Sequence, residues 1–314
     1  MALAIGIDIG GTKVAAGVVD VDGTVVASVR RPTPSTDPEA VEHTIAQVVR
    51  ELRKDHDVVA VGIGAAGFID AARSTVLFAP NLAWRDEPLR DDVAKLVDLP
   101  VVVENDANAA AWGEHRFGAG QGATDLVCVT VGTGIGGGIV LGGQLYRGTF
   151  GIGAEFGHMR VFPNGRRCGC GQDGCWEQYC SWRALLREAR EIADVRRDYG
   201  ARLLELGDGK PEGITPPEVT RAAEEGDPAA LECFERVGAW LGQGLADLAA
   251  LLDPAVFVVG GGVADAGEML LGPARRTFAQ RLTGTAYRPH AEIRLATLGN
   301  LAGMVGAADL ARLG

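Results

Sequence analysis

The sequence predicts an α/β protein, and three observations lead to this prediction. Runs of β-forming residues alternate with helical patterns along most of the 314 residues. The chain opens with three β-rich runs that Gly-Gly and Asp-Gly separate. The rhythm of strand, glycine turn and strand at residues 5–19 returns at residues 127–141, which indicates two related halves.

The first half begins with a predicted antiparallel meander, because Asp-Gly between β-rich runs is a strong hairpin signal. Its strands are expected over 3–10, 13–20 and 24–31. The elements expected next are a helix at 38–55, a buried strand at 58–66, a loop at 80–84, a helix at 87–97, a strand at 100–106 and an Ala-rich helix at 107–116.

The second half opens with three more predicted strands over 125–148, again separated by glycine turns. Helices are expected at 181–204, 217–225 and 228–252, with an exposed loop at 207–218. A buried strand at 255–262 leads into a helix, and a strand at 293–299 and a helix at 303–313 close the chain.

Composition and charge exclude several classes of protein. The formal net charge is −11 and no basic block is present, which argues against nucleic-acid binding. No apolar run is long enough to span a bilayer, and the N-terminus lacks the pattern of a signal peptide, so we expect a cytoplasmic protein without a membrane partner.

The glycine turns are candidate phosphate sites. Gly132, Gly134 and Gly137 satisfy G-x-G-x-x-G, but the residues that follow predict a strand where a dinucleotide fold requires a helix. No P-loop pattern is present either. Two hairpin turns rich in backbone N–H groups remain, and such turns can hold phosphate oxygens. The alternative is a pair of ordinary hairpins.

Asp8 stands inside an apolar strand, where a carboxylate is unfavourable unless it is paired or near a metal. We expect it to face Mg²⁺ or the reaction centre, with Thr12 and Lys13 contacting phosphates. The alternative is a carboxylate that the amides of the turn satisfy.

Asn105 and Asp106 join a predicted strand to a predicted helix, so both could be helix caps. The functional interpretation is that Asn105 binds a sugar hydroxyl and Asp106 accepts its proton. The carboxyl end of a strand in an open α/β sheet favours this interpretation, since ligands usually bind there.

The strongest signal is a set of four metal ligands, His158, Cys168, Cys170 and Cys175. Three thiols and one imidazole complete a tetrahedral structural Zn²⁺ site. Cys180 is a weaker substitute ligand, and buried or redox cysteines are the alternative. Glu155 and Glu177 flank the four ligands in sequence, where they could bind sugar hydroxyls or merely be surface charges.

Taken together, these motifs resemble the ROK family (repressors, open reading frames, kinases). The resemblance rests on the stretch from Gly6 to Lys13, the run from Gly132 to Gly138, the sequence Glu155-Phe156-Gly157-His158, the segment from Cys168 to Glu177, and Gly260-Gly261-Gly262. It covers nearly the whole chain, and within the family the chain looks most like bacterial glucokinases of actinobacterial type.

The resemblance implies an actin-like ATPase (ribonuclease H-like) fold, with two lobes around a cleft. The expected lobes are residues 1–107 with 300–314, and residues 108–299. Dimers or tetramers of identical chains are also implied. The nucleotide site would include Asp8, Gly10, Gly11, Thr12, Lys13, Thr133, Gly134, Gly136, Gly138, Gly260, Gly261 and Gly262.

The implied activity is phosphorylation of a hexose at its 6-hydroxyl by ATP and Mg²⁺, with glucose as the expected sugar and Zn²⁺ as a structural ion. Asn105, Asp106, Glu155, His158 and Glu177 would bind the sugar, and Asp106 would be the catalytic base. A kinase for N-acetylhexosamine or fructose is the alternative. A sugar-sensing repressor is less well supported, because the first phosphate motif begins at residue 6 and leaves no room for a helix-turn-helix segment.

Overall fold

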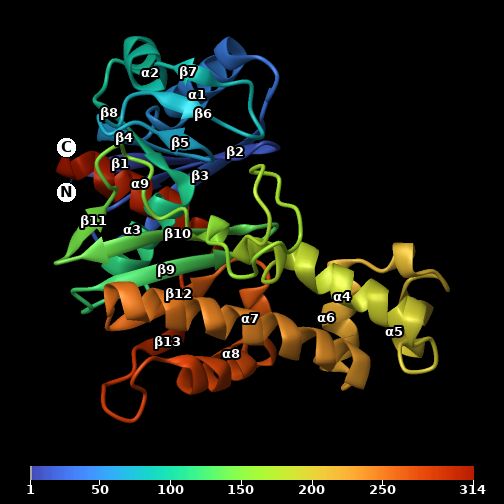
Figure 1. The fold of residues 1–314 in the computed structure, drawn as a ribbon. Coiled ribbons are helices and arrows are strands. Elements are labelled where there is room, and N and C mark those ends of the chain that lie inside the picture. The colour runs from blue at the N-terminus through green and yellow to red at the C-terminus, as the bar shows by residue number, and fades with distance from the viewer. Residues whose placement is uncertain (1) are drawn as a thin grey trace. The chain divides into compact units, whose positions relative to one another are not determined.

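A computed structural model describes residues 2–314 of the chain (Figure 1). Two compact units divide the chain. The first holds the residues up to Cys128 together with Gly137–Ala154 and Ala296–Gly314, and the second holds Val129–Gly136 and Glu155–Leu295. The predicted lobe boundaries at residues 107 and 300 stay a prediction.

A five-stranded sheet forms the centre of the first unit, in the order β3-β2-β1-β4-β8. Strand β1 runs antiparallel to β2 and parallel to β4, and β4 is parallel to β8. The predicted opening meander is therefore confirmed, because β2 also pairs with β3 in antiparallel fashion. The strands are β1 (Leu3–Ile9), β2 (Lys13–Val19), β3 (Val25–Pro32), β4 (Val58–Ala65) and β8 (Val101–Asn105).

Both faces of β1 are covered, which explains its almost unbroken apolar sequence. Ile5 and Ile7 join the core on the side of helix α1 (Pro38–Leu52). Gly6, between them, faces helix α9 (Ala302–Leu313), where its hypothetical Cβ atom would stand 1.8 Å from the carbonyl oxygen of Met304. Strand alternation thus places Asp8 on the face that α9 covers.

Two further helices of the first unit are α2 (Leu89–Val97) and α3 (Asp106–Phe117). Helix α3 packs along α9, and the indole N–H of Trp112 donates to the carboxylate of Asp309 over 2.9 Å. A small sheet of β5 (Phe68–Ile69), β6 (Val76–Phe78) and β7 (Arg85–Glu87) was not predicted, and the expected loop at 80–84 lies between its last two strands.

The second five-stranded sheet has the order β11-β10-β9-β12-β13. In chain order, this is the same arrangement as in the first sheet: third, second, first, fourth, fifth. The likeness of the two halves that the glycine turns indicated therefore extends to the order of the strands. The strands are β9 (Leu126–Val131), β10 (Ile135–Leu141), β11 (Gln144–Tyr146), β12 (Val256–Gly260) and β13 (Glu292–Leu295).

Helices make up most of the second unit. The helices expected over 181–204 are α4 and α5, which residues 196–200 separate. Helix α7 begins at Pro228 after its N-cap Asp227, and α8 packs along it (Figure 1). The helices are α4 (Trp182–Val195), α5 (Ala201–Leu206), α6 (Pro216–Glu224), α7 (Pro228–Leu252) and α8 (Glu268–Arg281). Within residues 2–314, none of the helices has the length and apolar character needed to cross a membrane.

Candidate active site

Asp8 lies one residue before the end of β1, against α9. A Cβ atom on Gly303 would stand 3.6 Å from its Oδ1 atom. Burial, and then the negative charge of Asp106, raise the pKa of Asp8 to about 6, whereas the ammonium of Lys13 acts in the opposite direction. At neutral pH Asp8 therefore carries a charge that its surroundings disfavour, as suits a carboxylate placed to meet a cation.

The first predicted phosphate turn joins β1 to β2. The N–H of Gly10 donates to the carbonyl of Lys13 over 3.0 Å and closes the hairpin. The side chains of Thr12 and Lys13 are exposed, and Gly11 packs closely on Asn81. The turn thus presents an exposed hydroxyl and an exposed ammonium at the carboxyl end of β1.

Asn105 is the N-cap of α3, as the capping interpretation predicts. Its side-chain oxygen accepts from the N–H of Asn108 over 3.0 Å, and its Nδ2 donates to the carbonyl of Gly67 over 3.1 Å. Asp106 has a different role in the helix, because its carboxylate accepts from the N–H of the next residue, Ala107, over 2.9 Å.

Burial raises the pKa of Asp106, and hydrogen bonds from the Ala107 N–H and the Asn105 side chain oppose this shift. A base whose pKa is raised toward the working pH accepts a proton more effectively. Since Asn105 caps the helix, the carboxylate of Asp106 is not needed as its N-cap.

The second predicted phosphate turn lies between β9 and β10, in the second unit. The N–H of Gly132 donates to the carbonyl of Gly134 over 2.9 Å, and Thr133 is exposed between them. The carbonyl of Gly132 accepts from the N–H of Trp182, at the start of α4, over 2.8 Å. Gly136 is partly exposed where β10 begins.

Gly138, which the resemblance placed in the nucleotide site, lies further along β10 and is buried in the first unit. A Cβ atom there would stand 2.5 Å from the Cβ atom of Ala111 in α3. The structure therefore places Gly138 against a helix and away from the turn itself.

The third glycine motif, Gly260–Gly262, begins at the last residue of β12. Gly261 has a φ of 85° and lies against Val131, the last residue of β9, with its hypothetical Cβ atom 2.6 Å from that carbonyl oxygen. Only glycine fits this position. A Cβ atom on Gly262 would stand 2.8 Å from the Nε1 atom of Trp182. Trp182 therefore contacts both motifs, the second through its backbone N–H and the third through its indole ring.

Trp182 is not among the candidate residues that the sequence indicated. The structure leaves Trp182 partly exposed, with its indole beside Gly262. The only signal in the sequence is its position just after the cysteine segment.

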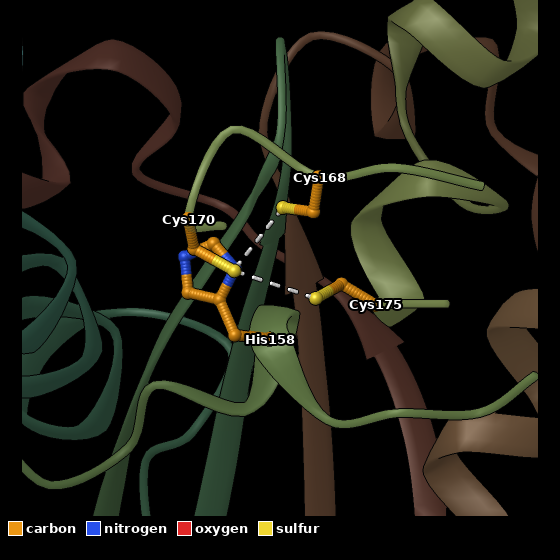
Figure 2. Close-up of side chains that lie close together, drawn as sticks. All are labelled: His158, Cys168, Cys170 and Cys175. Carbon is orange, nitrogen blue, oxygen red and sulfur yellow. Dashed lines mark hydrogen bonds between the residues drawn. The ribbon is translucent and has the colours of Figure 1, made fainter. Parts of the chain in front are cut away.

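The four predicted zinc ligands come together in the second unit (Figure 2). Their ligand atoms all lie within 4.8 Å of one another. The Sγ atoms of Cys170 and Cys175 are 3.6 Å apart, and Sγ of Cys168 is 3.6 Å from Nδ1 of His158. Four ligands about 2.3 Å from a tetrahedral Zn²⁺ would be separated by about 3.8 Å. The donor set and its spacing therefore fit the ion.

The two flanking carboxylates lie beside this cluster. Oε1 of Glu177 is 3.0 Å from Sγ of Cys168, and Oε2 of Glu155 is 4.0 Å from Nε2 of His158. The imidazole thus directs Nδ1 toward the thiols and Nε2 toward Glu155. Cys180, the substitute ligand that the sequence allowed, is buried outside the cluster.

The pattern of the ROK family matches residues 4–313. The chain belongs to the ROK family. This ROK protein is 54% identical over 312 residues to the glucokinase of Streptomyces coelicolor, a match that covers 99% of this chain and 98% of that glucokinase.

Solved structures give the same result. A ROK family glucokinase from Streptomyces griseus, crystallised with glucose and AMPPNP, matches with a TM-score of 0.89 and 56% identity over 100% of both chains. The ROK hexokinase of Thermus thermophilus matches with a TM-score of 0.83 and 36% identity, over 99% of this chain and 98% of that one. The predicted α/β fold of the actin-like ATPases is therefore confirmed for this ROK protein, as is its predicted family.

Proposed function

We propose that this ROK protein is a glucokinase, which transfers the γ-phosphoryl group of ATP to the 6-hydroxyl of glucose. The observation that carries the proposal is its similarity, along the whole chain, to a Streptomyces glucokinase crystallised with glucose and an ATP analogue. The polar groups at the glycine turns, at the start of α3 and at the cysteine cluster are of the kinds that this activity needs.

In this proposal, Asp106 is the general base. Its carboxylate would accept the proton of the 6-hydroxyl as the oxygen attacks the γ-phosphorus. Burial raises its pKa, which favours this role, and general-base catalysis contributes about 10²–10⁴-fold in rate. Asn105 would orient the same sugar, because its side-chain oxygen can accept a second hydrogen bond besides the one from the N–H of Asn108.

Glu155, His158 and Glu177 would hold other hydroxyls of the sugar. Carboxylates and an imidazole N–H suit this task, since each can accept from or donate to a hydroxyl. His158 would use both nitrogens, Nδ1 as a metal ligand and Nε2 toward the sugar.

The glycine motifs would hold the nucleotide. The turns at Gly10–Lys13 and Gly132–Gly134 offer backbone N–H groups, and Lys13 offers a positive charge for the phosphates. Bound Mg²⁺ would supply charge neutralisation at the phosphoryl oxygens, with Asp8 as the carboxylate that faces it. Gly260–Gly262, Gly136 and Gly138 complete the nucleotide set that we propose from the resemblance.

Zn²⁺ in this proposal is structural, because three cysteines and one histidine leave no open coordination position for a water molecule. The enzyme would work in the cytoplasm, where thiolate ligands of this kind remain reduced, and it would assemble as a homodimer or homotetramer. Light scattering after size-exclusion chromatography measures that assembly directly.

A panel of sugars in an assay coupled to ADP release tests the activity. We expect glucose to give a kcat/KM at least about tenfold above those of fructose and N-acetylglucosamine. NMR of the product should place the phosphoryl group on the 6-oxygen. If another sugar gives the highest kcat/KM, that sugar becomes the proposed substrate and the proposed reaction type is unchanged. Tight glucose binding without turnover would instead favour a sugar-sensing regulator.

A further inference from the structure

Glu104, which no part of the proposed function uses, is a buried carboxylate beside the proposed base. It lies in β8 one residue before the N-cap Asn105, and its side chain is 1% exposed. A buried carboxylate destabilises a protein unless charge and hydrogen bonds compensate it. All of its partners lie in the first unit.

One oxygen of Glu104 holds the start of α3. Oε1 accepts from the backbone N–H of Asn105 over 3.0 Å and from Nδ2 of Asn108 over 3.1 Å. These are the two residues that the N-cap hydrogen bond of the helix joins. The proposed base Asp106 stands between them, so Glu104 holds the backbone on one side of it and the side chain of Asn108 on the other.

The other oxygen meets two guanidinium groups. Oε2 lies 2.8 Å from Nε of Arg147 and 3.3 Å from Nε of Arg73. The contact to Arg147 lacks the alignment of a hydrogen bond, so this oxygen is compensated by charge. We call Glu104, Arg73 and Arg147 the Glu104 network.

Both arginines are themselves held in place. Arg147 donates from Nη1 to the carbonyl of Ala71 over 3.0 Å and from Nη2 to that of Asp70 over 2.9 Å. Arg73 has the left-handed φ of 55°, and its carbonyl accepts from Val103 in β8 over 3.3 Å. The network therefore joins three segments that are distant in sequence: the 70–75 turn, the end of β11 and the start of α3.

We infer that Glu104 is a positioning residue, which sets the orientation of Asp106 for proton transfer and is itself held by Arg147 and Arg73. The inference rests on the proposed function. It adds residues that do not touch the sugar or the nucleotide but decide how accurately the base meets the 6-hydroxyl. A misplacement of about 1 Å can reduce a rate by about 10²-fold, so such a network has a measurable effect on kcat.

The chain offers a matched control in Asp309. This carboxylate is also buried, at 4% exposed, and it accepts from Trp112 and Arg116 of α3 over 2.9 and 3.1 Å. It also pairs with Arg312 over 3.0 Å. It ties the middle and end of α3 to α9, whereas Glu104 holds the first turn. Asp309→Asn therefore tests what the loss of a buried ion pair on the same helix does to the enzyme.

The experiment compares Glu104→Gln, Asp106→Asn, the double variant and Asp309→Asn in kcat, glucose KM and Tm, with the full chain. We expect Glu104→Gln to lower kcat by about 10–10²-fold, and to add less than about threefold once Asp106 is already Asn. Asp309→Asn should lower Tm while kcat stays within about twofold of wild type. Arg147→Lys, which keeps the charge but loses the two-carbonyl fork, should lower kcat with a smaller change in Tm than Glu104→Gln.

Three results would overturn the inference. In the first, folded Glu104→Gln keeps kcat within about twofold of wild type. In the second, the fold-loss of kcat in the double variant equals the product of the losses in Glu104→Gln and Asp106→Asn, as expected for two independent residues. If Glu104→Gln does not fold, an unchanged kcat in Arg147→Lys decides against the network. Near-normal kcat in Asp106→Asn is a separate outcome. It would show that Asp106 is not the base of the proposed function, and Glu104 would then have no base to position.

Discussion

Glu177 lies against Gly134. A Cβ atom at position 134 would stand 2.3 Å from the Oε2 atom of Glu177, so the glycine turn after β9 touches the carboxylate that follows the cysteine cluster. The other oxygen of the same carboxylate is 3.0 Å from Sγ of Cys168. One side chain thus links the proposed metal site to a proposed phosphate turn within the second unit.

Replacing Gly134 by Ala should therefore affect both substrates. The added methyl group displaces Glu177, which should raise the KM for glucose by about tenfold, and it alters the turn itself, which should raise the KM for ATP by about tenfold. Steady-state kinetics with each substrate varied in turn measures both constants.

Gly132→Ala is the control in the same turn. A Cβ atom there would meet no heavy atom of residues 2–314 within 4 Å, chain neighbours aside, and the residue is not among those with a left-handed φ. We expect an unchanged KM for glucose in this variant, so that any rise in the KM for ATP reports contact with the nucleotide. If Gly134→Ala spared glucose binding, Glu177 would not be a sugar ligand.

Asp8→Asn should stabilise the ligand-free protein at pH 8. The pKa of Asp8 is raised from 3.8 to about 6, so the folded state binds more protons than the unfolded chain between these values. The free energy of unfolding therefore falls as the pH rises through this window, and at pH 8 the charged carboxylate is fully unfavourable. An amide of the same shape removes that charge.

Thermal denaturation of the two proteins from about pH 4 to pH 8 measures this difference. We expect the Tm of Asp8→Asn to exceed that of wild type by an amount that grows with pH, while its kcat falls because the residue no longer faces Mg²⁺ with a charge. A variant that is less stable than wild type at pH 8 would show that a partner compensates the charge in the folded protein.

Asn105→Ser separates capping from sugar binding. Serine is an equally good N-cap, so we expect the Tm to change little, whereas alanine at this position should cost about 1 kcal/mol of stability. Serine offers no amide group to Gly67 or to the sugar. The glucose KM should rise about tenfold in both variants, and isothermal calorimetry with glucose alone would confirm the loss of affinity. Normal glucose affinity in the serine variant would leave Asn105 as a cap only.

Local chemistry made much of the fold predictable. The meander at the N-terminus follows from Gly-Gly and Asp-Gly between β-rich runs, and the structure has it as β1, β2 and β3. The cluster of His158 with three cysteines was predictable for the same reason, because ligand types and spacing define a tetrahedral site within a short segment.

Very short elements and contacts between distant segments could not be predicted from the sequence. Strands β5 to β7 contain two or three residues each, too few to show a period of two. Helices were expected over 181–204, but the pattern did not indicate where one ends and the next begins, which the structure places at residues 196–200. Arg147 meets Glu104, and Trp182 meets Gly262, only because the fold joins distant segments. The roles of the individual site residues stay predictions, which the variants described here test.

The final expectation concerns the metal and the sugar pocket. The segment from Glu155 to Glu177 contains all four ligands. It has little regular structure besides short 3-10 turns. Such a segment depends on its ion for order, so loss of Zn²⁺ should release both carboxylates from their positions. The proposed phosphate turns lie outside this segment.

Cys170→Ser should therefore lose stoichiometric zinc and detectable glucose binding while it keeps ATP binding. Elemental analysis measures the metal, and calorimetry with glucose and with ATP measures the two affinities. Cys180→Ala is the matched control, because Cys180 is buried close by in sequence but outside the cluster, and it should retain both zinc and glucose. Normal glucose affinity in a zinc-free Cys170→Ser protein would show that the ion is unnecessary for the pocket. Wild-type protein with a metal-bound water in place of one of the four ligands would instead indicate a catalytic ion, because only an open coordination position lets zinc activate water.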